Sequence, residues 1–263
     1  MGERPSANDL EEEGASREAV KKKRSGGDAF PVTPASAVIG VRSTNPVERA
    51  RSHTVLAKRY WKATYKYIRL RWSKPAATAE EITQEFFLRA LDKNTFLGYD
   101  ARQARFRTFV RVCIDRFVVD QERHTQAKKR GGGTFFLQLD FKSAEDELGS
   151  EVLGVVDPEA LFETEWVKSL LESAVGTLHA VCIREKKEQH FRAFELFHLS
   201  EDSERPSYED IAQELGISVR DVNNRLTYAR REFRAAVLEA LRECTGSEQE
   251  MQDEARVVLG IDF

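Results

Sequence analysis

The sequence lacks the features that mark secreted, membrane-spanning and zinc-binding proteins. It has only three cysteines, Cys113, Cys182 and Cys244, and no two of them have CxxC spacing. We therefore expect reduced thiols that serve packing, with neither a disulfide nor a metal site. No apolar run approaches the length needed to cross a bilayer, and the N-terminus has no signal-peptide core. These absences predict a cytoplasmic protein that needs no cofactor.

Motifs for phosphate binding and catalysis are also absent. The sequence shows no glycine-rich phosphate loop, nucleophile elbow or clustered metal carboxylates, which disfavours an enzyme such as a nuclease or transferase. Apolar residues make up 41% and charged residues 32% of the 263 residues. A soluble chain of this size and composition can hold two small cores.

A large excess of one charge is missing as well, because the net charge is only −3. That small value conceals two oppositely charged segments. Residues 101–130 hold nine Lys or Arg against three acids, a net charge of +6, whereas residues 140–172 hold ten acids against two lysines, a net charge of −8. The basic segment suits a polyanionic partner such as a nucleic acid.

Hydrophobic periodicity predicts an all-α chain with two small helical domains. The segment before the first domain is rich in Ser, Gly, Pro and charge, so we expect it to be disordered. Helical patterns cover 45–72, 78–91, 105–130, 161–178 and 186–199. The predicted organisation is a disordered extension over 1–44, a first domain over 45–130, a flexible acidic linker over 131–160, a second domain over 161–244 and a tail over 245–263.

Residues 207–234 have the pattern of a helix-turn-helix. Ser207 is followed by Asp210 and Ser218 by Asp221, the spacing of a capping box at the start of each helix. An ordinary pair of core helices shares this pattern, but the polar side of the second helix suits DNA bases and phosphates. The candidate DNA-binding residues are Arg220, Asn223, Asn224, Arg225, Thr227, Tyr228, Arg230 and Arg231.

Three motifs in order resemble a bacterial RNA polymerase sigma factor of the sigma-70 family, extracytoplasmic-function (ECF) type. They are TAEEITQEFFLRA at 78–90, FRTFVRVCIDRFVVDQER at 106–123, and the helix-turn-helix. The long linker and the extensions indicate an atypical, extended member. The resemblance implies that the first domain is sigma region 2, the second is region 4, and the partners are core RNA polymerase and promoter DNA.

The resemblance also implies roles for residues of region 2. Its acidic helix would bind core polymerase through Glu80, Glu81, Gln84 and Glu85. Its basic helix would hold the melted promoter element, with aromatic rings stacking on bases and cations neutralising phosphates. This second set is Arg105, Arg107, Phe109, Arg116, Asp120, Arg123, Lys128, Lys129 and Arg130. A plain solvated face and a plain core are the alternatives for the two helices; we expect Phe117 in the core.

The chain departs from the family pattern at several positions, so the promoter sequence that it recognises does not follow from the resemblance. Phe109 replaces a usual Trp, Arg116 a usual Asn, and Asn223 with Asn224 a usual Lys-Ser pair. A stand-alone helix-turn-helix regulator is the alternative function, although it leaves the acidic and basic helices of the first domain without a role. Control would fall to an anti-sigma factor, a modifying kinase or the extensions themselves.

The acidic linker has three competing interpretations. It could occupy the polymerase channel that nascent RNA later takes, fold back on residues 101–130 and shield them, or act as a solvated spacer. Within it Phe135, Leu137, Leu139 and Phe141 recur at every second position, like one face of an extended strand, which predicts an extended segment with one packed face.

Overall fold

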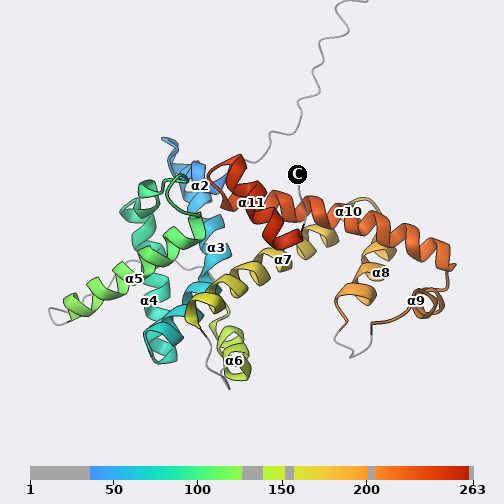
Figure 1. Ribbon diagram of the computed structural model, residues 1–263, viewed down its shortest axis with the longest axis horizontal. Coiled ribbons are helices and arrows are strands. Elements are labelled where there is room, and N and C mark those ends of the chain that lie inside the picture. Colours follow the sequence, from blue (N-terminus) through green and yellow to red (C-terminus); the bar gives the residue numbers. More distant parts are fainter. Residues whose placement is uncertain (1–35, 126–138, 152–156, 201–204, 261–263) are drawn as a thin grey trace, which may run out of the picture. The chain divides into compact units, whose positions relative to one another are not determined.

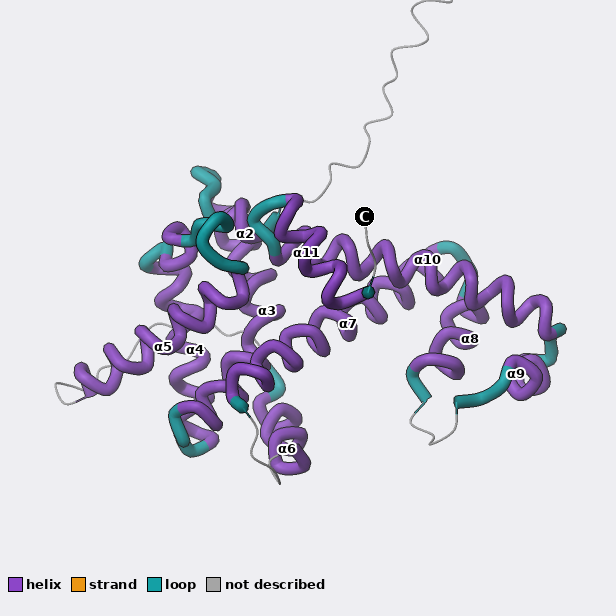
Figure 2. Tube along the Cα trace, in the orientation of Figure 1, coloured by secondary structure: helices purple, strands orange, loops and turns teal. Residues whose placement is uncertain are grey.

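Helices form all of the regular secondary structure in the parts of the chain that the structure describes, residues 36–125, 139–151, 157–200 and 205–260. Figure 1 shows the computed structural model and Figure 2 its helical composition. The predicted all-α class is confirmed. Within these ranges no helix combines the length and the apolar character that a membrane span requires.

Helix α3 (Pro46–Arg71) contributes its buried side to the main hydrophobic core. It begins as the sequence predicts, because the Asn45 side chain accepts a hydrogen bond of 2.9 Å from the backbone N–H of Val47 and Pro46 fills the first helical position. Its buried residues Tyr60 and Tyr67 lie in the main core. Helix α3 packs against α4 and α7.

The prediction of disorder over 1–44 is wrong for its last residues. The short helix α2 (Ala37–Gly40) packs against α3 and buries Val38 and Val41. The contact is close: a Cβ added at Gly40 would lie 2.2 Å from Oγ of Ser52. Apolar burial therefore outweighs the polar composition of this segment; residues 1–35 lie outside the described residues.

Helices α4 (Ala76–Asp92) and α5 (Phe106–Thr125) follow, with the 3-10 helix η1 (Thr95–Gly98) between them. Both helices correspond to predicted ones. The buried side of α5 consists of Phe106, Val110, Ile114 and Val118, a spacing of four residues that places them on one helical face. The predicted end of this helix, residues 126–130, lies outside the described residues.

The acidic linker contains a helix that the sequence did not predict. Helix α6 (Phe141–Glu151) packs on α3 by burying Phe141, Ala144 and Leu148. The expected extended conformation is therefore wrong at Phe141, while Phe135 and Leu137 lie outside the described residues. The prediction of a flexible linker over the whole of 131–160 is also wrong, because aromatic contacts of Phe141 with Trp61 and Tyr65 hold α6 against α3.

Helix α7 (Pro158–Arg184) takes part in both hydrophobic regions of the described chain. Its first half places Phe162 and Trp166 against Tyr60 of α3. Its second half places Leu178 and Cys182 in a smaller cluster with residues of α8 and α10. The four helices that follow are α8 (Glu188–His198), α9 (Tyr208–Leu215), α10 (Val219–Cys244) and α11 (Glu248–Leu259).

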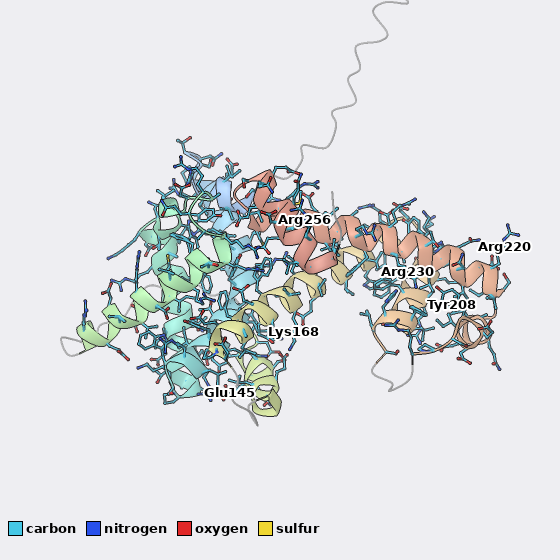
Figure 3. The ribbon with its side chains drawn as sticks, in the orientation of Figure 1. Glu145, Lys168, Tyr208, Arg220, Arg230 and Arg256 are labelled. Atoms are coloured by element: carbon cyan, nitrogen blue, oxygen red, sulfur yellow. The ribbon has the colours of Figure 1, made fainter. Side chains whose placement is uncertain are left out.

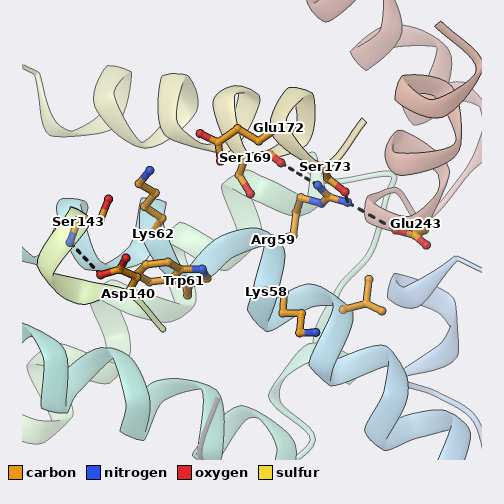
Figure 4. A pocket seen from close by; sticks show the side chains of 11 residues that line it. Lys58, Arg59, Trp61, Lys62, Asp140, Ser143, Ser169, Glu172, Ser173 and Glu243 are labelled. Atoms are coloured by element: carbon orange, nitrogen blue, oxygen red, sulfur yellow. Dashed lines mark hydrogen bonds and ion pairs between the residues drawn. The ribbon is translucent and has the colours of Figure 1, made fainter. Parts of the chain in front are cut away.

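Arg59 joins α3 to α7 and α10 (Figure 4). One of its terminal nitrogens donates to the carbonyl of Ser169 at 2.9 Å, and the other donates to Oγ of Ser173 at 3.2 Å. The second nitrogen also lies 3.6 Å from a carboxylate oxygen of Glu243. These contacts form one wall of a cavity of about 400 Å³.

The predicted C-terminal tail is a packed helix. Helix α11 buries Met251 and Ala255 in the main core, and Ser247 caps its first turn. Glu250 attaches the helix to the start of α5: its carboxylate accepts hydrogen bonds from the Tyr99 hydroxyl at 2.8 Å and the Phe106 backbone N–H at 2.6 Å. The C-terminal segment is therefore part of the main hydrophobic core.

Candidate nucleic-acid and polymerase interface

Capping boxes fix the start of both helices of the helix-turn-helix. In α9 the backbone N–H of Asp210 donates to Oγ of Ser207 at 3.2 Å, and in α10 that of Asp221 donates to Oγ of Ser218 at 3.1 Å. The serine hydrogen bonds lower the pKa of both aspartates, which remain charged caps. Gly216, with φ of 64°, provides the left-handed residue that ends α9.

The first turns of α10 present a polar face to solvent. Arg220, Asn223, Asn224 and Thr227 are exposed, whereas Val222 and Leu226 are buried against Ile211 and Ala212 of α9. Figure 3 shows Arg220 at the outer end of α10, directed away from the protein. Four of the predicted DNA-binding residues therefore share one accessible surface, which we call the α10 face.

Of the other four predicted DNA-binding residues, Arg231 is exposed, whereas Arg225, Tyr228 and Arg230 are half-buried. Arg230 lies 5.0 Å from the ring of Phe197, donates to the Tyr208 hydroxyl at 3.3 Å and donates to Nε2 of His198 at 3.1 Å. Figure 3 shows Arg230 and Tyr208. The Tyr228 hydroxyl donates to Glu185 at 2.7 Å. Arg225 is half-buried, and Arg231 pairs with the neighbouring Glu232 at 2.7 Å.

Helix α4 separates its apolar and acidic sides as predicted. Ile82, Phe86 and Phe87 are buried, whereas Glu81 and Glu85 are exposed. The remaining two candidates are half-exposed, and Nε2 of Gln84 lies 3.4 Å from Oε1 of Glu80. Glu85 also accepts a hydrogen bond from Gln121 of α5. This acidic side is available for a basic partner, and Glu81 has the most open position.

A cavity of about 330 Å³ lies among α4, η1 and α5. Phe109, Arg116 and Asp120, three of the predicted strand-binding residues, line it. The rings of Phe86 and Phe117 and the cations Arg89 and Lys93 also line it. Phe117, which we expected in the core, is half-buried here, and the guanidinium of Arg89 lies 5.4 Å from its ring. We call this site the aromatic cavity.

Sequence reasoning missed Arg89 and Lys93. They follow each other at a spacing of four residues on α4, which is a local signal for one helical face. Their role depends on the contact between α4 and α5, which periodicity alone does not reveal. Cys113 also lines the cavity, and burial raises its pKa to about 11, so its thiol is neutral near pH 7.

The sequence model of the ECF sigma factor family matches residues 68–239. This chain belongs to the ECF sigma factor family. The matched range includes α4, the aromatic cavity, α9 and the α10 face, and it covers more than half of the chain. Neither a curated protein nor a solved structure matches the chain.

Membership of this family makes the protein a promoter-specificity subunit of RNA polymerase, whose partners are core polymerase and promoter DNA. The family is not a class of enzymes. Among the described residues no group of three or more His, Cys, Asp or Glu is arranged to hold a metal ion. Cys113, Cys182 and Cys244 are buried free thiols.

The basic helix of this sigma factor divides its predicted strand-binding residues into two groups. Arg116 and Arg123 are exposed on its later turns. Arg105, just before the helix, and Arg107, on its first turn, lie beside glutamates of other helices, as does Arg111, which was not among the predicted residues. Phe106 is completely buried and offers no ring to a base, and Lys128, Lys129 and Arg130 lie outside the described residues.

Proposed function

We propose that this sigma factor recognises the upstream promoter element with the α10 face and holds the melted downstream strand at the aromatic cavity. The acidic side of α4 docks on core polymerase. One observation supports this assignment best: all three surfaces lie within residues 68–239, the range that the family model matches. Each surface also has the charge and the side chains that its partner requires.

The α10 face has the groups that read bases in the major groove. An Asn side chain can bond adenine in two places, and an Arg can bond guanine in the same way. Asn223, Asn224 and Arg220 lie at the start of a helix, the part that helix-turn-helix proteins insert into the groove. Arg230 instead stabilises the domain around it through the Tyr208 hydroxyl.

The aromatic cavity suits an unstacked nucleobase. Phe109 and Phe117 supply ring surface, on which a base gains about 1–3 kcal/mol by stacking. Arg89, Lys93 and Arg116 surround the rings with positive charge that can neutralise the flanking phosphates. Asp120 is the one carboxylate among the residues that line this cavity, and it can accept hydrogen bonds from an exocyclic amine.

Transcription in vitro tests the function as a whole. Core polymerase with this protein should initiate at discrete start sites on a library of bacterial promoter regions, whereas core polymerase alone should not. Gel shifts with and without core polymerase distinguish a sigma factor from the alternative, a stand-alone helix-turn-helix regulator. Specific promoter binding that is equally strong without core polymerase, together with no initiation, would show a stand-alone regulator instead.

Substitution of the α10 face tests the upstream assignment. Asn223→Ala and Asn224→Ala should each relax base preference at one upstream position, at a cost of about 1–3 kcal/mol for the preferred base. Gln189→Ala is the control, since it truncates an amide side chain at an exposed position of α8, outside the α10 face. Unchanged preference across a randomised upstream library in both Asn variants would rule out this assignment.

A further inference from the structure

Three glutamates from α7 and α11 surround the arginines on the first turns of α5. Arg107 lies 2.6 Å from Glu163 and 2.9 Å from Glu254. Arg111 lies 2.8 Å from Glu159 and 3.6 Å from Glu163, and Arg105 lies 3.7 Å from Glu254. We call Glu159, Glu163 and Glu254 the carboxylate cluster.

The cluster removes these arginines from solvent to different degrees. The side chain of Arg107 is only 9% exposed, and its guanidinium also lies 4.8 Å from the ring of the buried Trp166. That of Arg111 is 17% exposed. Arg116 and Arg123, on the later turns, are exposed. The arginines with low exposure are therefore those that lie beside the glutamates, and the exposed arginines lie beyond them.

Carboxylates are chemical equivalents of phosphates for arginine, since a guanidinium binds either group with the same paired N–H donors. The cluster thus occupies the groups that a DNA strand would use along the first half of α5. Two of its members come from the acidic segment that follows the basic one in sequence, and both are on the first turns of α7.

The third member comes from a helix outside the matched family range. Helix α11 begins at Glu248, and the match ends at residue 239. Glu250 fixes α11 to the start of α5 through Tyr99 and the Phe106 backbone, and the carboxylate also accepts a hydrogen bond from Gly246 N–H at 2.7 Å. One turn later, Glu254 is held beside Arg107, with a carboxylate that is 2% exposed.

We propose that the carboxylate cluster competes with single-stranded DNA for the first half of α5, so that the free sigma factor holds this surface closed. The later half, with the aromatic cavity and Arg116, stays open. The inference rests on the proposed function, since it assigns a regulation to the strand-binding helix. Full engagement of a melted strand then requires the first turns of α7 or helix α11 to move away from α5.

The test measures binding of the free full-length protein to a fluorescent 12-nucleotide single-stranded DNA of mixed sequence. The double variant Glu159→Gln/Glu163→Gln removes both carboxylates beside Arg111 and one of the two beside Arg107, and it should strengthen binding by roughly tenfold at about 50 mM salt. The dependence of log affinity on log salt concentration should steepen by about 1.4, since each phosphate of a single strand that is neutralised adds about 0.7.

Glu188→Gln/Glu209→Gln is the matched control. These exposed glutamates lie on the first turns of α8 and α9, and the change alters the net charge by the same amount. The control should leave affinity within about twofold of wild type. Equal affinities of wild type and the cluster variant would overturn the proposal, and so would an equal rise in both variants.

A second variant covers the case in which the double variant fails to fold. Glu159 is 53% exposed and pairs with Arg111, so Glu159→Gln should keep the fold and bind about threefold more tightly. Circular dichroism establishes that helicity is retained; a folded Glu159→Gln variant with wild-type affinity overturns the proposal. Run-off transcription by wild type is measured separately, so failure of the sigma function and failure of the cluster mechanism give different results.

Discussion

At the scale of single residues, the surroundings decide what each arginine of α5 does. Arg107 is buried between two glutamates and a tryptophan ring, whereas Arg116 is exposed at the aromatic cavity. Both lie in the same motif segment, 106–123, and the sequence predicts strand binding for both, although only Arg107 matches the family pattern. The sequence shows their charge but not the glutamates that α7 and α11 bring to Arg107, because those contacts span long sequence separations.

Arg107→Ala should therefore reduce mainly the stability of the protein, whereas Arg116→Ala should reduce mainly its binding of a DNA strand. Loss of Arg107 leaves Glu254 buried without its closest partner, and breaking a buried ion pair costs about 3–5 kcal/mol. Loss of Arg116 should change stability by less than about 0.5 kcal/mol but weaken strand binding. Urea denaturation and oligonucleotide binding measure the two effects. Equal unfolding midpoints for both variants would contradict this assignment.

His53 should make stability depend on pH. Burial, followed by the nearby charge of Arg49, lowers its pKa from 6.5 to about 4. Between these values the unfolded chain binds a proton that the folded chain does not, so stability falls as the pH drops from 6.5 towards 4. His53 is 5% exposed and stacks on Phe96 with ring centroids 5.5 Å apart.

His53→Phe should remove this dependence, because a phenyl ring can keep the stacking contact and does not titrate. The variant should gain more thermal stability over wild type at acidic pH, near the folded-state pKa, than at mildly alkaline pH. Wild type and variant carry the same other ionisable groups, so the difference between their melting temperatures isolates this histidine. An identical difference at both pH values would show that His53 has the same pKa in the folded and unfolded states.

At the scale of elements, helices with sustained periodicity or a capping box were predictable from sequence, whereas α2, α6 and α11 were not. Helices α3, α4, α5 and α10 have sustained periodicity, and two of them have caps that the sequence identifies, Asn45 and Ser218. Helices α2, α6 and α11 are short, and short helices depend on tertiary packing for their stability. Phe141 and Met251 supply that packing, but their partners Trp61 and the region 2 core are remote in sequence.

Helix α4 is the element whose proposed role is easiest to isolate. Its acidic side is exposed at Glu81, whereas Glu85 is in contact with Gln121 of α5. Glu81→Lys should weaken binding to core polymerase by roughly tenfold, since a like charge opposite a basic partner costs more than about 1 kcal/mol. Surface charges contribute little to folding, so helicity should not change.

Glu188→Lys on α8 is the control for Glu81→Lys, because it makes the same charge reversal at another exposed helical position. Fluorescence titration of labelled protein with core polymerase measures both affinities. If Glu81→Lys binds core polymerase as tightly as Glu188→Lys, another part of region 2 makes the contact.

At the scale of the whole molecule, the acidic and basic segments of the sequence are partners of each other. Glu145 and Glu147 of α6 pair with Arg69, Lys62 and Lys66 of α3, and Glu159 and Glu163 of α7 pair with arginines of α5. From sequence alone, the segregated charge indicates a basic DNA-binding surface and an acidic linker. That the linker folds back and shields the basic surface is only one of the alternatives. The structure places α6 on α3, and it places glutamates of α7 and α11 beside α5.

Helix α7 also links two hydrophobic clusters. Leu170 and Ala174 belong to the main core, and Leu178 and Cys182 belong to a smaller cluster with residues of α8 and α10. The two sets are separated by Gly176, an exposed helical position at which an added Cβ would meet no atom within 4 Å. An unbroken α7 should make the two regions unfold together, and Gly176 is the point at which this coupling can be adjusted.

Substitutions at Gly176 should therefore change cooperativity in opposite directions. Gly176→Ala should raise stability by about 0.5–1 kcal/mol, because alanine loses less backbone entropy in a helix than glycine and finds open space here. Gly176→Pro should cost about 3 kcal/mol or more and break α7 between the two clusters. Differential scanning calorimetry should then show one sharper transition at higher temperature for the alanine variant and two separate transitions for the proline variant. A single transition in the proline variant would mean that the contacts of α3 and α10, including Arg59 with Glu243, couple the two regions without a continuous α7.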